Sequence, residues 1–419
     1  MKKFFKFMFD RPILILFILI LLIFVPPMFV IQPQSQIKLI ARTIGIDKVG
    51  DEIEVTIIYY QPSISQAYTE SYNLVSAKGS SLSLALDLAA DYTGKQLVLA
   101  HMNNVAVSND IAEENLVKYL NHLVRAYTIN NSINVFVTNV NAKDFLKDTL
   151  KSHGKTANQE SGIVEHNDKY IIGTSSNIEN IMLSSYGPNK TALIDMLNVS
   201  EKEGEDLSGG SQSNASSNSS SGGGSSAGSS SGGEDDKPKY LANDGSVAII
   251  RDGKKVGDLT RQEVEALNVI NGANEWPKIE LKNYSDENFN NATIVLNVPN
   301  KYVKYKAYFD GNTPTVLVKT NMLLTIYEVL QNSQTKTIFS QKNLYLNETM
   351  QKAIADKLKS DFYPVYQKLQ DLNADAFDFY SLFHKKYQKE FDNYLQSLEN
   401  PEEYIKGIKV ILQVESKDK

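Results

Sequence analysis

One stretch near the start of the chain determines on which side of a membrane the remaining residues are expected to fold. Residues 12–31 have the sequence PILILFILILLIFVPPMFVI, which contains no charged side chain. A helix of about 20 apolar residues covers the hydrocarbon core of a bilayer, so this run predicts a transmembrane helix. Lys2, Lys3, Lys6 and Arg11 precede it. The positive-inside rule therefore keeps residues 1–11 in the cytoplasm and sends the C-terminal remainder outside.

A cleaved signal peptide is the alternative for the same stretch. The apolar region of a signal peptide is ordinarily shorter and is followed by a small-residue cleavage motif. Here the run ends in Pro26, Pro27, Met28 and Phe29, without such a motif. We therefore favour a retained anchor and a single-pass membrane protein. Charged or amide side chains interrupt every later apolar run, so the outer portion is expected to fold in water.

Composition narrows the function of that outer portion. The formal net charge is −6, from 43 Lys+Arg and 49 Asp+Glu, which gives no electrostatic reason to expect nucleic acid as a partner. The chain has no cysteine, and this excludes disulfides, zinc–thiolate sites and thiol nucleophiles. At 419 residues the chain is long enough for more than one domain.

Strand and helix patterns alternate over region 37–206, which favours an α/β or α+β domain there. Strands are expected at 37–46, 53–60, 133–138 and twice within 95–107. Helices are expected at 80–91, 108–127, 142–150, 178–183 and 191–197. The last two of these helices are assigned to a peripheral helical lobe between residues 154 and 198.

Region 207–239 is rich in Ser and Gly and predicts a disordered linker, because its side chains could not form a core. It either joins separate domains or is a loop inserted in one body; the sequence leaves both open. Region 240–277 predicts a hairpin with a type I′ turn at Asp252-Gly253, then a helix that Thr260 and Glu263 begin as a capping box. Asn271-Gly272 is expected to end this helix.

Region 278–419 predicts an α+β domain. Strands are expected at 278–284, 293–298, 302–309, 315–330 and 404–414. A long helix is expected at 343–372, kinked or broken at Pro364, with further helix over 375–398. The fold class predicted for the whole chain is α+β (mixed α/β): a transmembrane helix, then a multi-domain extracytoplasmic body with mixed sheets and a long C-terminal helix.

Four stretches, taken in order, resemble one known family. They are IGIDKVGDEIEVTIIYYQP at 44–62, YTGKQLVLAHMNNVAVSNDIAEENLVKYLNHLVRAYTI at 92–129, IIRDGKKVGDLTRQEVEALNVINGA at 249–273 and KLQDLNADAFDFYSLFHKKYQKEFDNY at 368–394. With these stretches the chain is similar to the Ger(x)C family, the C subunits of bacterial spore germinant receptors. The similarity in order and spacing extends from about residue 37 to the C-terminus.

This resemblance implies a non-enzymatic extracytoplasmic subunit. It implies integral-membrane A- and B-type subunits as partners, a role in nutrient-triggered germination, and the inner spore membrane as the location. Members of the family usually carry a lipoprotein signal whose modified cysteine is followed by Trp-Asp. Because this chain has no cysteine, the hydrophobic helix is expected to replace the lipid anchor.

Motifs for catalysis or metal binding are not found, so we expect no catalytic residue, cofactor or metal. No pair among the histidines is spaced for one helix face: His101, His122, His153, His166 and His384. The G-x-S-x-G match at 228–232 lies in the Ser/Gly linker, and the segment 187–191 is interpreted as a turn rather than a phosphate loop. Asp371, Asp375 and Asp378 are expected near helix ends, with Asp375 as an N-cap.

The candidate interaction surface is the hairpin–helix unit, with Leu259, Leu267 and Trp276 as its apolar contacts. Trp276 is the single tryptophan, and tryptophan is frequent both in cores and at binding hot spots. Two alternatives stay open. One is an extracytoplasmic small-molecule binding or sensor module of unknown ligand. The other is a cell-envelope protein unrelated to germination, such as an enzyme, which would need paired carboxylates or a histidine-centred site.

Overall fold

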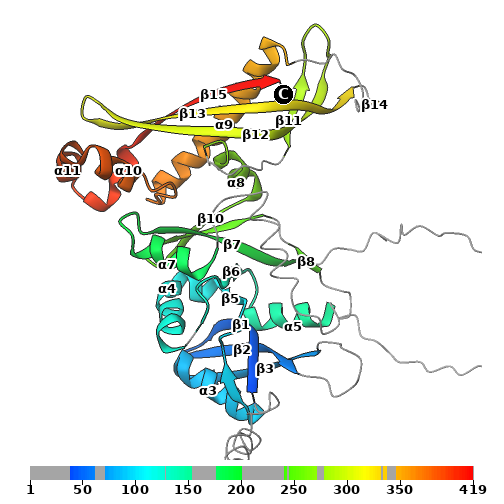
Figure 1. Ribbon diagram of the computed structural model, residues 1–419, viewed down its shortest axis with the longest axis vertical. Coiled ribbons are helices and arrows are strands. Elements are labelled where there is room, and N and C mark those ends of the chain that lie inside the picture. The colour runs from blue at the N-terminus through cyan, green and yellow to red at the C-terminus, as the bar shows by residue number, and fades with distance from the viewer. Residues whose placement is uncertain are drawn as a thin grey trace, which may run out of the picture.

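The chain folds into two bodies, each built on one sheet, which are stacked along the long axis of the molecule (Figure 1). The computed structural model describes residues 38–61, 71–127, 129–152, 176–200, 240–242, 245–270, 278–331, 334–336 and 346–418. The predicted transmembrane helix at 12–31 lies outside these residues. Within them, no helix is both long enough and apolar enough to cross a membrane.

A ten-stranded mixed sheet forms the first body, in the order β10-β9-β7-β6-β5-β1-β2-β3, with β4 beside β1 and β8 beside β7. The four central strands β1, β5, β6 and β7 run parallel to one another. The strands are β1 (Lys38–Val49), β2 (Glu52–Gln61), β3 (Ser71–Gly79), β4 (Gln96–Val98), β5 (Asn104–Ser108), β6 (Asn134–Thr138), β7 (Thr191–Ser200), β8 (Tyr240–Ala242), β9 (Val247–Arg251) and β10 (Lys254–Leu259).

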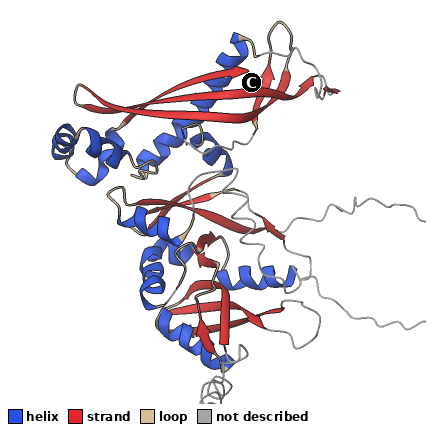
Figure 2. Cartoon of the chain, viewed as in Figure 1, coloured by secondary structure: helices blue, strands red, loops and turns tan. Residues whose placement is uncertain are grey.

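Helices cover both faces of this sheet (Figure 2). They are α3 (Leu82–Thr93), α4 (Asn109–Ala126), α5 (Ala142–Ser152) and α7 (Ile178–Tyr186). Successive residues of one strand enter different cores: Ile57 packs in the cluster under α3, α4 and α7, whereas Ile58 packs with Phe136 and Phe145 against α5. Because both faces are covered, β5, β6 and β7 bury successive apolar residues, at 105–107, 135–137 and 192–194.

The second body is a five-stranded sheet in the order β11-β12-β13-β14, with β15 beside β13, packed against helices. Its strands are β11 (Ile279–Tyr284), β12 (Ala292–Asp310), β13 (Thr313–Gln331), β14 (Gln334–Lys336) and β15 (Lys409–Asp418). Its helices are α8 (Arg261–Leu267), α9 (Glu348–Asp371), α10 (Phe379–Lys386), α11 (Gln388–Ser397) and the 3₁₀ segment η2 (Pro401–Gly407). Met350, Ile354 and Phe362 on α9 belong to one hydrophobic core with the sheet.

The hairpin–helix unit belongs to both bodies. β9 pairs antiparallel with β7, so the hairpin β9–β10 completes the first sheet. Its turn residues Asp252 and Gly253 have φ angles of 50° and 79°, as a type I′ turn requires. The predicted capping box of Thr260 and Glu263 is present, and the α8 it begins packs in the second core. The unit therefore ties the two bodies together through a continuous strand–helix connection.

The strands on either side of the predicted linker are neighbours in the sheet. β7 ends at Ser200, β8 begins at Tyr240, and these two residues are register partners in an antiparallel pair. Of the two possibilities left open by the sequence, this pairing favours a long insertion between adjacent strands of one body.

The helix predicted at residues 191–197 in a peripheral lobe is wrong. These residues form β7, which lies between β6 and β9 inside the first sheet. A short apolar run fits a buried strand as well as a helix turn, and sheet pairing decides between them. The predicted helix at 178–183 is confirmed as α7.

The second body also differs from prediction in its details. The strands predicted at 293–298 and 302–309 are one strand, β12, with a register shift between Asn297 and Asn300. Pro364 lies inside α9, which continues through it as one helix. Helix α8 ends at Leu267, before the predicted stop at 271–272. The last strand begins at Lys409, because η2 occupies the residues before it.

Candidate functional site

The two bodies meet where the start of β7 approaches the connection between α9 and α10. The Asn189 side-chain amide donates to the Asp375 carbonyl oxygen at 3.3 Å, and the Asp375 backbone N–H donates to the Thr191 hydroxyl at 3.2 Å. Between them in sequence, the Lys190 ammonium lies 2.8 Å from the Glu402 carboxylate. We call these five residues the latch.

Asp375 is fixed in the latch by its own carboxylate, which is buried. Its two oxygens accept the backbone N–H groups of Phe379 and Tyr380, each at 2.9 Å, and one also accepts the Tyr404 hydroxyl at 2.8 Å. Burial raises the pKa of the Asp375 carboxyl, and these hydrogen bonds oppose the rise. The prediction that Asp375 is an N-cap is wrong, because Asp378 is the N-cap of α10. Asp375 nevertheless satisfies amides at the same helix end.

A second contact fixes the end of α8 to the second sheet. Three successive carbonyl oxygens, of residues 268–270, accept hydrogen bonds from side chains of β12 and β13. The donors are the Lys301 ammonium at 2.6 Å, the Thr320 hydroxyl at 2.7 Å and the Tyr305 hydroxyl. These carbonyls belong to the turn that follows α8, whose N–H groups donate to the last carbonyls of the helix, and we call the arrangement the tertiary C-cap of α8. Burial lowers the pKa of Lys301 to about 7 and raises the pKa of Tyr305 to about 12.

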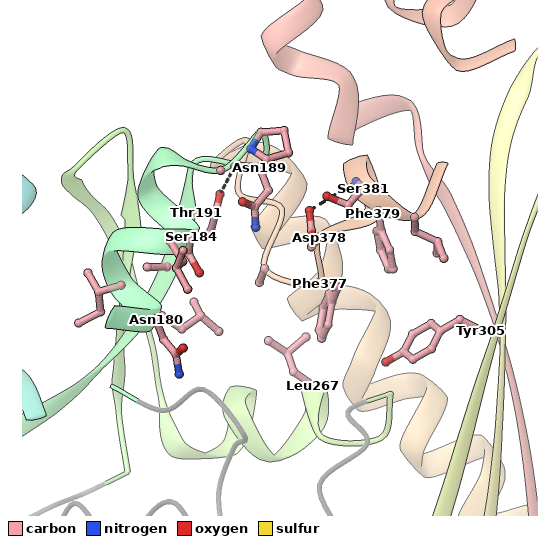
Figure 3. A pocket seen from close by; sticks show the side chains of 18 of the residues that line it. Asn180, Ser184, Asn189, Thr191, Leu267, Tyr305, Phe377, Asp378, Phe379 and Ser381 are labelled. Atoms are coloured by element: carbon pink, nitrogen blue, oxygen red, sulfur yellow. Dashed lines mark hydrogen bonds between the residues drawn. The ribbon is translucent and has the colours of Figure 1, made fainter. Parts of the chain in front are cut away.

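A cavity of about 730 Å³ is lined by both of these regions (Figure 3). α7 and β7 of the first body supply one wall, and α8, α10 and β12 of the second body supply the other. Figure 3 shows Leu267 and Phe377 near its centre, the Tyr305 hydroxyl pointing toward them, and Asn180 on the opposite wall. The lining combines apolar surface with amides and hydroxyls, and the volume is that of a small-molecule site. A ligand held here would contact both bodies at once.

In the described ranges, no three His, Asp or Glu side chains are grouped so that they could hold a metal ion. His101 is in an exposed turn, His122 Nε2 lies 2.7 Å from the Ser83 hydroxyl, and His384 stacks on Tyr380. His153 and His166 lie outside the described residues.

The predicted interaction residues are placed as follows. Leu259 is 0% exposed and Leu267 is 2% exposed, and both pack in the second core. Leu267 also lines the cavity. Trp276 lies outside the described residues. A direct contact of Leu259 with a partner would require the second core to open, whereas Leu267 is reached through the cavity. Their role as an interaction surface stays a prediction.

The residues of the latch are predicted one by one, but their proximity is not. The sequence predicts a turn at 187–191 and a helix cap at Asp375, and no sequence signal indicates that Asn189 and Asp375 meet across 186 positions. Lys301 interrupts a strand pattern in the same way as an exposed lysine would. Its burial follows from the position of α8, which the strand pattern does not predict.

The fold and the joint define a two-body mixed α/β protein, and comparison with known families identifies the class. A family model described as "Spore germination protein N-terminal domain" matches residues 38–199. A second, described as "Spore germination B3/ GerAC like, C-terminal", matches residues 245–417. The chain belongs to the Ger(x)C family of spore germinant-receptor C subunits. The second match begins at the hairpin that completes the first sheet, so the family boundary and the sheet boundary differ.

A solved structure supports the same fold. The chain is similar to the structure titled "Crystal Structure of the GerBC protein", with a TM-score of 0.50 and 14% sequence identity over 90% of this chain and 96% of that chain. No curated protein matches the chain.

Proposed function

We propose that this chain is a membrane-anchored, extracytoplasmic C subunit of a germinant-receptor-like complex, acting through protein–protein assembly in nutrient-triggered germination. The observation that carries the proposal is the pair of family matches, which covers both bodies. The apolar run at 12–31 supports the anchor, with the N-terminus in the cytoplasm and the bodies outside the inner spore membrane. An anchor raises the effective concentration of the bodies toward integral-membrane A- and B-type subunits.

The architecture supports an assembly role rather than catalysis. The latch, the tertiary C-cap of α8 and the shared hairpin–helix unit hold two bodies at a defined orientation. An oriented pair of rigid bodies presents a large docking surface at low entropic cost, because little has to be ordered on binding.

Native pull-down of the tagged full-length chain from membranes tests this function. Cells are sampled during vegetative growth and during sporulation, and copurifying proteins are identified by mass spectrometry. We expect multi-spanning A- and B-type subunits from sporulating cells alone. Recovery of other partners from vegetative membranes, or of no multi-spanning protein, would assign the chain to an envelope role unrelated to germination.

A small-molecule sensor is a second candidate, favoured by the cavity between the bodies. A ligand of the native state raises the melting temperature, so amino acids, sugars and nucleosides are screened by thermal shift. Asn180 lines the cavity and is exposed, whereas its neighbour Glu179 is exposed and does not line it. A ligand of this cavity would stabilise the wild type and the Glu179→Trp variant but not the Asn180→Trp variant.

A further inference from the structure

Strand β11 forms an edge of the second sheet. It pairs with β12 on one side, with Ile279, Glu280 and Leu281 opposite residues 296, 295 and 294. Its other side faces a groove of about 980 Å³. All residues from Lys278 to Ser285 line this groove, although successive side chains of a strand point to opposite faces. The wall of the groove is therefore the backbone edge of β11, with its hydrogen-bonding groups.

The opposite wall is formed by two helices and mixes apolar with polar side chains. Ala266 of α8 and four α9 residues, Ala353, Leu358, Pro364 and Val365, supply the apolar part, and Gln262, Thr349 and Ser360 are among the polar residues. Six of the seven charged side chains that line the groove take part in ion pairs, in Lys357–Asp361 at 2.6 Å, Lys368–Glu263 at 2.7 Å, Arg261–Glu265 at 2.9 Å and Lys282–Glu280 at 3.3 Å. The seventh, Lys278, has its ammonium 3.2 Å from the centroid of the Tyr327 ring. Paired charges produce a weak net field, so the groove matches an uncharged segment better than a charged one.

The other outer strands of this sheet are shielded or short. The Leu412 backbone N–H of β15 donates to the Tyr363 hydroxyl of α9 at 3.2 Å, which occupies an edge donor. β14 has three residues. β11 itself ends in a bulge, where the register shifts between Leu281 and Tyr284 and Asn283 has a φ of 54°. Proteins protect sheet edges in these ways, and the bulge leaves the regular part of the β11 edge short.

We propose that the edge of β11 that does not pair with β12 receives an extended, uncharged segment of an integral-membrane partner as an added strand. The segment is about four or five residues long, because the bulge interrupts the edge after Leu281. Backbone hydrogen bonds to β11 supply the pairing, and alternate side chains of the segment pack against α8 and α9. This inference rests on the proposed function and names the docking site for its partner.

Site-specific crosslinking locates the partner segment. Because the chain has no cysteine, one introduced thiol carries a photo-crosslinker at a single position. Thr349→Cys places it on the groove wall at an exposed residue, and Lys352→Cys places it on an exposed part of α9 outside the groove. In membranes of sporulating cells, we expect Thr349→Cys to crosslink one contiguous uncharged segment of a multi-spanning subunit, and Lys352→Cys not to.

Hydrogen exchange measures the pairing itself. The amides of residues 278–282 are followed in the full-length chain alone and in the purified complex, and those that face the groove should slow by about tenfold or more in the complex. Ser360→Trp, an exposed substitution on the groove wall, should reduce partner recovery about tenfold, whereas Lys352→Trp should not.

Two outcomes overturn the docking site while leaving the proposed function intact. In the first, multi-spanning subunits copurify but the β11 amides exchange at unchanged rates. In the second, Thr349→Cys crosslinks a second copy of this chain, which would assign the edge to self-association. If no multi-spanning subunit copurifies with the wild type, the proposed function itself fails, and the docking site fails with it.

Discussion

Lys301 is a buried cation whose position couples stability to pH. Its ammonium donates to the Asn268 carbonyl, and burial lowers its pKa from 10.5 to about 7. The unfolded chain retains this proton up to its ordinary pKa, so between pH 7 and 10.5 the unfolded state binds more protons than the folded state. The free energy of unfolding therefore rises with pH in this window. From pH 7 to 9 the rise should be about 2 kcal/mol.

Urea unfolding of the purified full-length chain at pH 7, 8 and 9 measures this rise. Lys301→Met should remove it, whereas Lys304→Met, at an exposed position on the same strand, should retain it. Measurements stop at pH 9 because tyrosines with raised pKa, including Tyr305, have the opposite effect above pH 10. Equal slopes in the wild type and Lys301→Met would show that Lys301 remains charged in the folded state.

At the scale of elements, two aspartates at the start of α10 accept hydrogen bonds from its backbone N–H groups but differ in burial. Asp375 is buried and accepts two backbone N–H groups and a hydroxyl, whereas Asp378 is an exposed N-cap. Asp375→Asn places an amide NH₂ where an acceptor is needed, and should lower the free energy of unfolding by about 1–3 kcal/mol. Asp378→Asn should change it by less than about 0.5 kcal/mol, because asparagine is an equally good N-cap. Chemical denaturation of both variants gives the comparison, and similar losses would contradict the assigned roles.

Local signals predicted many elements and failed where distant residues meet. The capping box and the Asp-Gly turn depend on neighbouring residues, so both are confirmed. The stretch at 44–62 resembles the Ger(x)C family, but the sequence does not show which residues its side chains contact. In the structure, Gly45 and Asp47 both contact α5. A Cβ at Gly45 would lie 2.9 Å from a Leu146 side-chain carbon on that helix. Asp47 accepts the Ala142 and Lys143 N–H groups at the start of that helix, at 2.6 and 2.8 Å.

The candidate site was less predictable than the elements that form it. The latch, the tertiary C-cap of α8 and the β11 groove each combine residues from regions that the sequence predicts as separate units. All three adjoin the hairpin–helix unit: the latch lies at the start of β7, which pairs with β9, and the other two include α8 or the turn after it. Strand pairing between distant segments depends on which faces are covered, and a single sequence does not encode that in any local pattern.

At the scale of the whole molecule, the pairing of β7 with β8 makes a prediction about region 201–239. Ser200 and Tyr240 are directly opposite each other, so the segment between them can be replaced by a two-residue Asn-Gly turn that continues the antiparallel pair. Shortening a connecting segment this much reduces the entropy cost of closing it by about 2–3 kcal/mol. The shortened chain should therefore unfold at a higher urea concentration than the wild type and retain its partners in the membrane pull-down.

A control that replaces the segment with an unrelated Ser/Gly sequence of equal length should match the wild type in both assays. Loss of partners in both variants, with stability unchanged, would show that the sequence of this region contributes to assembly.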